Sequence, residues 1–175
     1  QNYLRSAGLW ADDLVSGSTK AEYLKAEEGG LKPALSQSEA NFTRIHFFRA
    51  KIEDKQVATW NQTQALIQVT VGGGIGIKQT IEVQYKYSPV EVSRFETYPI
   101  KTSLEAWQLL QAGKGNIAAA AGNGQIIVRT IDLAYYDSDA PQEFMQPVYV
   151  FKGDNGFVGY VPAVQDKWLA TMIKN

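Results

Sequence analysis

The sequence contains no cysteine, and three further scarcities narrow what the protein can be. Without cysteine there is no Cys₄ zinc site, iron–sulfur cluster or thiol nucleophile. A single histidine, His46, removes most general-base schemes at neutral pH. Seventeen basic residues against eighteen acidic ones leave no positive excess, which argues against nucleic acid and anionic membrane surfaces as partners. No run approaches the roughly 18 apolar residues that a membrane span requires.

The length of 175 residues suits one ordinary domain or two small lobes. A chain of this size can bury roughly 70% of its unfolded surface, so it needs neither metal nor disulfide to fold. The sequence begins at Gln1 instead of methionine, which leaves two readings open. A signal peptide or membrane anchor precedes Gln1, or Gln1 is an ordinary boundary. The absence of cysteine is compatible with an exported bacterial domain.

Three segments are predicted to be helical. Residues 3–15 place apolar side chains at a spacing of three to four, interrupted by Gly8. A second helix begins with a capping box, in which Thr102 and Glu105 satisfy each other's backbone amides, and it ends at Gly113. A short terminal helix is expected over residues 164–173.

The rest of the chain is predicted to form strands and turns. Residues 20–35 favour a hairpin around Gly29-Gly30, and Asn123-Gly124 is typical of a two-residue hairpin turn. From residue 75 to 87 apolar and polar side chains alternate, which indicates a sheet covered on one face. The further strands are expected over residues 42–49, 65–71, 118–121, 125–136, 144–151 and 156–161.

These elements predict an α+β fold of antiparallel sheets with a few short helices. The two halves of the chain follow a similar order. Each has a short helix with a tryptophan (Trp10, Trp107), then a long aromatic strand and a closing hairpin. We therefore expect two similar α+β lobes, residues 1–95 and residues 96–175.

Candidate sites for catalysis, cofactors or metals have simpler structural explanations. His46 lies in the middle of a predicted strand, where a sheet or core histidine is more common than a catalytic one. The glycine-rich residues 72–76 are followed by a strand and no GK[ST], so a glycine turn accounts for them better than a phosphate loop. Residues 137–139 begin like a calcium loop but lack its glycine and its bidentate glutamate. No catalytic residue, cofactor site or metal site is predicted.

Aromatic side chains gather in the last three predicted strands. We expect most of them to pack in the core. Any that face outward would form a surface that binds a peptide or a partner domain. The candidate partner surface consists of Tyr135, Tyr136, Tyr149, Phe151, Phe157 and Tyr160.

The second half of the chain resembles the YycH/YycI-type regulatory ectodomains, with a similarity to PepSY domains. The resemblance rests on TYPIKTSLEAWQLLQAGKGNI (97–117), IDLAYYDSD (131–139) and QPVYVFKGDNGFVGYVPAV (146–164). It implies an extracytoplasmic domain that is anchored by one N-terminal membrane helix outside this chain and acts by protein contact. YycH/YycI-type proteins restrain a membrane sensor kinase, so the resemblance also implies a membrane protein as the partner. It brings no catalytic residues.

The sequence thus favours a non-enzymatic extracytoplasmic interaction or regulatory domain of a bacterial envelope protein, without cofactor and without nucleic acid as a partner. The alternative is a small-ligand or peptide binder that uses the cleft between the lobes. An enzyme would require carboxylates distant in sequence to converge in one pocket.

Overall fold

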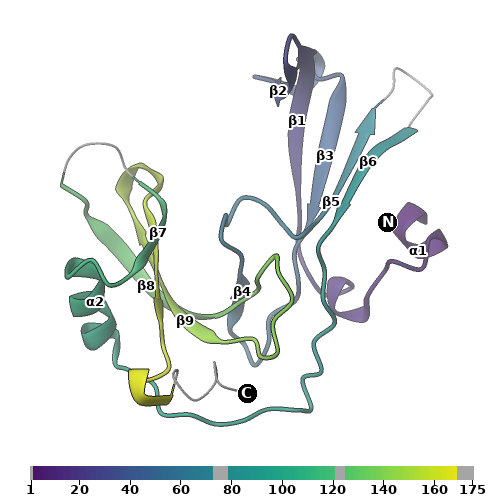
Figure 1. Cartoon of the computed structure of the whole chain (residues 1–175). Helices are drawn as coiled ribbons and strands as arrows, with labels where there is room; N and C mark the ends of the chain where they lie inside the picture. Colours follow the sequence, from purple (N-terminus) through teal and green to yellow (C-terminus); the bar gives the residue numbers. More distant parts are fainter. Residues whose placement is uncertain (1, 73–78, 121–124, 169–175) are drawn as a thin grey trace. The chain divides into compact units, whose positions relative to one another are not determined.

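The computed structural model describes residues 2–72, 79–120 and 125–168. The described part of the chain forms ten strands in two sheets, together with short helices (Figure 1). The predicted α+β class with antiparallel sheets is therefore confirmed. The chain divides into two compact units, Gln1–Ala50 with Gln62–Pro89, and Lys51–Asn61 with Val90–Asn175.

The first unit contains a five-stranded antiparallel sheet in the order β2-β1-β3-β5-β6. The predicted hairpin is present as β1 and β2, and Gly29 in its turn has a φ of 90°, which suits glycine. A 3₁₀ turn, η2, precedes β3. The elements are β1 (Thr19–Glu27), β2 (Gly30–Pro33), η2 (Gln37–Glu39), β3 (Phe42–Phe47), β5 (Ile67–Gly72) and β6 (Gln79–Tyr85).

The helix predicted over residues 3–15 is wrong in its extent. Helix α1 covers only Asn2–Ser6, and a 3₁₀ turn, η1, follows at Asp12–Leu14. Gly8 takes a left-handed φ of 69°, and the amide of Leu9 reaches back to the carbonyl of Leu4. Glycine therefore ends the helix here instead of only weakening it.

One face of the first sheet is the core of the first unit. Leu4, Leu9, Trp10, Ala11 and Leu14 of the N-terminal segment pack on this face. The opposite face also has buried residues, namely His46, Gln68 and Thr70, so the sheet is not covered on one side alone. Trp10 meets Phe47 edge to face with ring centroids 5.6 Å apart. The buried members of the cluster are Leu4, Leu14, Phe47, Ile67 and Val69.

The second unit contains a five-stranded sheet in the order β4-β8-β9-β10-β7. Four strands are antiparallel, and β4 pairs with β8 in parallel, with Val57 opposite Tyr135. A 3₁₀ turn, η3, joins β9 to β10. The elements are β4 (Gln56–Ala58), β7 (Asn116–Ala119), β8 (Val128–Tyr136), β9 (Pro147–Gly153), η3 (Asp154–Gly156) and β10 (Val158–Pro162).

Strand β4 makes the division of the chain differ from the expected lobes 1–95 and 96–175. Residues 51–61 belong to the second unit, although residues on both sides of them belong to the first. Ala58 is 7% exposed in the second unit's core, and its carbonyl accepts the amide of Asp137. The three residues of β4 are too short a run to stand out in the sequence as a strand.

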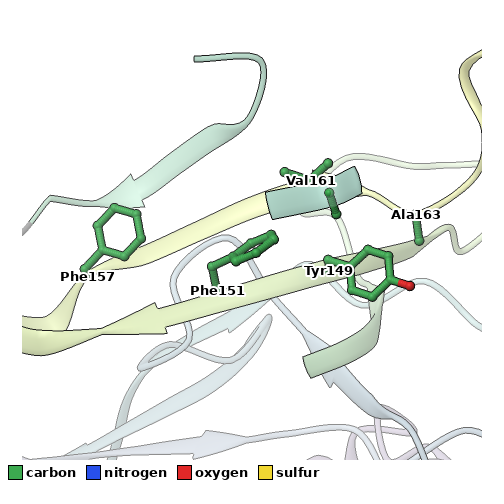
Figure 2. Close-up of a cluster of buried hydrophobic side chains, with 6 residues drawn as sticks. Tyr149, Phe151, Phe157, Val161 and Ala163 are labelled. Atoms are coloured by element: carbon green, nitrogen blue, oxygen red, sulfur yellow. The ribbon is translucent and has the colours of Figure 1, made fainter. Parts of the chain in front are cut away.

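Helix α2 (Ser103–Gln111) covers one face of the second sheet. The predicted capping box is confirmed, because Thr102 accepts from the amide of Glu105 and Glu105 accepts from the amide of Thr102. Figure 2 shows aromatic and aliphatic side chains of the sheet on the same side of β9 and β10. The cluster comprises Ala106, Tyr149, Phe151, Phe157, Val161 and Ala163.

The two sheets share a three-strand antiparallel meander, β3-β5-β6 in one and β8-β9-β10 in the other, but differ in how the remaining strands attach. The predicted Asn123-Gly124 turn and residues 73–76 of the glycine segment lie outside the described residues. Of the predicted terminal helix, residues 166–168 are helical and residues 169–173 lie outside the described part. None of the described helices is long and apolar enough to cross a membrane.

Candidate functional site

The predicted aromatic partner surface is largely a part of the core. Phe151, Phe157 and Tyr149 lie under α2 and are at most 8% exposed. Tyr160 is 3% exposed on the opposite face, and its hydroxyl donates to the carbonyl of Thr59 at 2.7 Å. Side chains alternate between the two faces of a strand, but here both faces are covered, so neither set of aromatic rings reaches solvent. We therefore assign these four residues to the core and not to a partner surface.

The remaining two tyrosines of that prediction are partly exposed. The hydroxyl of Tyr135 donates to Glu53 at 3.1 Å, and Tyr136 packs edge-on against Tyr160. Burial raises the pKa of both Tyr135 and Tyr136 above the ordinary value, so both hydroxyls stay protonated at neutral pH. They therefore act as apolar rings with a hydrogen-bonding tip, tied to the fold of the second unit.

A polar row crosses four strands of the first sheet, on the face opposite its core. We call Glu22, Arg44, Thr70 and Glu82 the polar row, because each residue is the direct cross-strand partner of the next. The Arg44 guanidinium lies between two carboxylates, 3.4 Å from Glu22 and 3.6 Å from Glu82. Its Nε donates to the Thr70 hydroxyl at 3.3 Å.

The polar row is internally satisfied. The Thr70 hydroxyl accepts from Arg44 and donates to Glu82 at 3.3 Å. Thr70 is only 1% exposed, so its hydroxyl is not presented to a substrate. The row therefore orders the strands of the first unit, and its exposed end at Glu82 contributes little to stability because water screens the charge.

His46 adjoins the polar row as a buried neutral imidazole with 1% of its surface exposed. Its Nδ1 accepts the amide of Ala65 at 3.3 Å, which places the proton on Nε2, 3.4 Å from Glu22. Burial lowers the pKa of His46 below its ordinary value, and the nearby Glu22 opposes that shift. Both ring nitrogens lie next to hydrogen-bonding partners, which agrees with a structural role for this histidine.

We expect the first unit to lose stability as the pH falls below about 6.5, the ordinary pKa of histidine. The pKa of His46 is lower in the folded chain, so the unfolded chain takes up the proton first and is favoured. Protonation of the folded chain would also turn Nδ1 into a donor facing the Ala65 amide.

The measurement is the free energy of unfolding as a function of pH, for the wild type and for His46→Asn. Asparagine keeps an acceptor for the Ala65 amide but does not titrate. The variant should have a flatter profile between pH 7 and pH 5. Since Glu22, Arg44 and Lys20 also face this site, only the difference between the two profiles reports on His46. Parallel profiles would contradict the assignment.

Three exposed isoleucines lie at the start of β8 or just before it. We call Ile126, Ile127 and Ile131 the β8 edge; they are 38%, 45% and 40% exposed. Ile131 shares a cross-strand row with Phe151, on the face that α2 covers, but lies at the border of the sheet. β4 pairs only with Ala134, Tyr135 and Tyr136, so the start of β8 has no neighbouring strand on that side among the described residues.

Comparison with known proteins identifies no relative of this chain. No family model matches the chain, and no curated protein or solved structure is significantly similar to it. The resemblance to YycH/YycI-type domains therefore stays a prediction. Among the residues that the structure describes, no group of three or more His, Asp or Glu side chains could hold a metal ion.

The polar row and the β8 edge were not recognised as sites in the sequence. Alternation did place Arg44 with His46, and Thr80, Glu82, Gln84 and Lys86 together on one face. It could not give the register that sets Arg44 between Glu22 and Glu82. For the β8 edge the signal was three isoleucines within six residues around the start of a strand, with no sign of which strand would lie beside them.

Proposed function

We propose that the chain is a non-enzymatic extracytoplasmic interaction or regulatory domain of a bacterial envelope protein, acting by protein contact. The observation that supports protein contact is the β8 edge, where exposed isoleucines border a stretch of β8 that pairs with no strand on that side in the described part of the chain. A chain without cysteine suits an oxidising compartment, because a free thiol there would risk misoxidation.

The main chain of β8 offers hydrogen bonds to a partner strand. The amide of Tyr136 donates to the carbonyl of Gln146, the residue just before β9, so the main-chain groups of even-numbered β8 residues face β9 and those of odd-numbered residues face the other side. Ile131 therefore points its amide and carbonyl outward. An extended peptide that adds to this edge would gain main-chain bonds, and it would bury the isoleucines.

A tight turn directly precedes the short strand β4. Just before β4, Ile52 and Lys55 exchange two backbone hydrogen bonds of 3.0 and 2.9 Å. Between them Glu53 and Asp54 have φ values of 47° and 64°, the left-handed region of a type I′ turn. The ladder between β4 and β8 therefore begins only after this turn, with Gln56 opposite Ala134, and does not reach Ile131.

The alternative proposal is a domain that binds a small ligand or a peptide. A thermal-shift screen separates it from a contact domain, because a specific ligand at 100 times its Kd adds about 2.7 kcal/mol to the free energy of unfolding. Stabilisation by a defined small molecule would favour the alternative.

The extracytoplasmic location can be tested with a single cysteine in this cysteine-free chain. Leu35 is 94% exposed, so Leu35→Cys in the full-length protein presents a thiol to solvent without disturbing a core. A membrane-impermeant maleimide should label it in intact cells as completely as in lysed cells. Labelling only after lysis would place the domain in the cytoplasm and overturn the proposal.

A further inference from the structure

Strand β6 is the longest end strand of the two sheets in the described part of the chain. The other end strands of the two sheets are β2 with four residues, β4 with three and β7 with four, whereas β6 has seven. β2 also carries Lys32 and Pro33, residues that commonly protect sheet edges from pairing. β6 has neither lysine nor proline between Gln79 and Tyr85. Its length and composition suit it for pairing with another strand.

The main-chain groups on the outer side of β6 follow from its pairing with β5. The amide of Lys86 donates to the carbonyl of Leu66 at 3.0 Å, so even-numbered residues here bond to β5. In an antiparallel ladder the intervening residues direct their amides and carbonyls to the opposite side. Val83 and Tyr85 therefore offer these groups to a strand that would lie beside β6.

The side chains of β6 and of Lys86, the next residue, would be complementary between two antiparallel copies of this segment. On the polar face Glu82 and Lys86 lie symmetrically about Gln84, with an acidic group at one end and a basic group at the other. On the apolar face, Val83 and Tyr85 flank the same point, and Tyr85 is 37% exposed.

We propose that β6 pairs antiparallel with β6 of a second copy of this chain, about a two-fold axis at Gln84. Glu82 of each copy then lies opposite Lys86 of the other, and Val83 lies opposite Tyr85. The outward main-chain groups of Val83 and Tyr85 meet as hydrogen-bonded pairs, and the two sheets join into one.

The polar row favours this register over its neighbours. Charges along the row alternate from Glu22 through Arg44 to Glu82, whose side chain is 57% exposed at the border of the sheet. Lys86 of the second copy continues the alternation. A register centred on Glu82 would set two like charges face to face, which is destabilising. One centred on Val83 would set Glu82 opposite Gln84 and lose both ion pairs.

Disulfide formation tests the register directly, because the chain has no cysteine of its own. In Gln84→Cys the two thiols face each other across the two-fold axis, in a non-hydrogen-bonded pair with Cα atoms about 4.5 Å apart. In the control, Thr80→Cys, each thiol lies opposite residue 88, and the two thiols are about 27 Å apart along the strands. Under mild oxidation Gln84→Cys should form a covalent dimer and Thr80→Cys should not.

The unmodified chain should sediment with twice its mass of 19.4 kDa, and charge reversal should control the association. Glu82→Lys or Lys86→Glu alone should weaken the dimer, and the double reversal should restore it. A monomer at all concentrations, or equal cross-linking at residues 80 and 84, would overturn the proposal. The β8 edge takes no part in this pairing, so such a result would leave the proposed function standing.

Discussion

Replacing Phe151 by alanine is expected to lower the free energy of unfolding of the second unit by about 3–5 kcal/mol. Phe151 is fully buried at the centre of the cluster between α2 and the sheet, and its ring lies 5.9 Å from that of Trp107. Its removal takes away buried apolar surface and leaves a cavity that the central strand β9 cannot close by moving.

The effect of Phe151→Ala can be measured by denaturant unfolding, with hydrogen exchange assigning the loss to the second unit. The matched control is Phe95→Ala in the same unit, because Phe95 is 74% exposed. The control should change the free energy of unfolding by less than about 0.5 kcal/mol. Equal effects of the two substitutions would show that the cluster under α2 is not the core of this unit.

Replacing Lys101 by methionine is expected to cost about 2–4 kcal/mol in the same unit. Lys101 is 7% exposed, and its ammonium group donates to the carbonyls of Pro162 and Val164 and pairs with Asp166 at 2.8 Å. Methionine fills a similar volume but donates nothing. The buried carbonyl of Val164 and the partly buried carbonyl of Pro162 would lose their charged donor, and this loss dominates the effect.

The control for Lys101→Met is Lys114→Met, since Lys114 is exposed in the same unit. Thermal or denaturant unfolding should separate the two variants clearly, with Lys114→Met close to the wild type. Wild-type stability of Lys101→Met would mean that water or another group satisfies the two carbonyls.

Much of the fold was predictable because its signals are local. The Thr102–Glu105 capping box fixes the start of α2, and Gly29 and Gly30 at the turn after β1 favour a hairpin. Gly8 shows the limit of spacing arguments. Leu4, Trp10, Ala11 and Leu14 do face one core, yet a single left-handed glycine divides the segment into a helix and a 3₁₀ turn.

The candidate sites depended on contacts that are distant in sequence. The exposure of Phe151 and Tyr160 was set by what covers each face of the sheet, including Thr59 and Trp60, which follow the short parallel strand β4. The polar row required the register of four strands. Side-chain alternation assigns a residue to a face, but pairing between distant strands decides which residues meet on it.

The most direct test of function by protein contact is photo-crosslinking from the β8 edge. A photo-reactive amino acid at Ile131 of the full-length protein, irradiated in intact cells, should give a discrete adduct with another protein. Lys114, exposed and polar in the same unit, is the control position and should give none. Absence of any adduct from Ile131, or the same adducts from Lys114, would contradict contact through this edge.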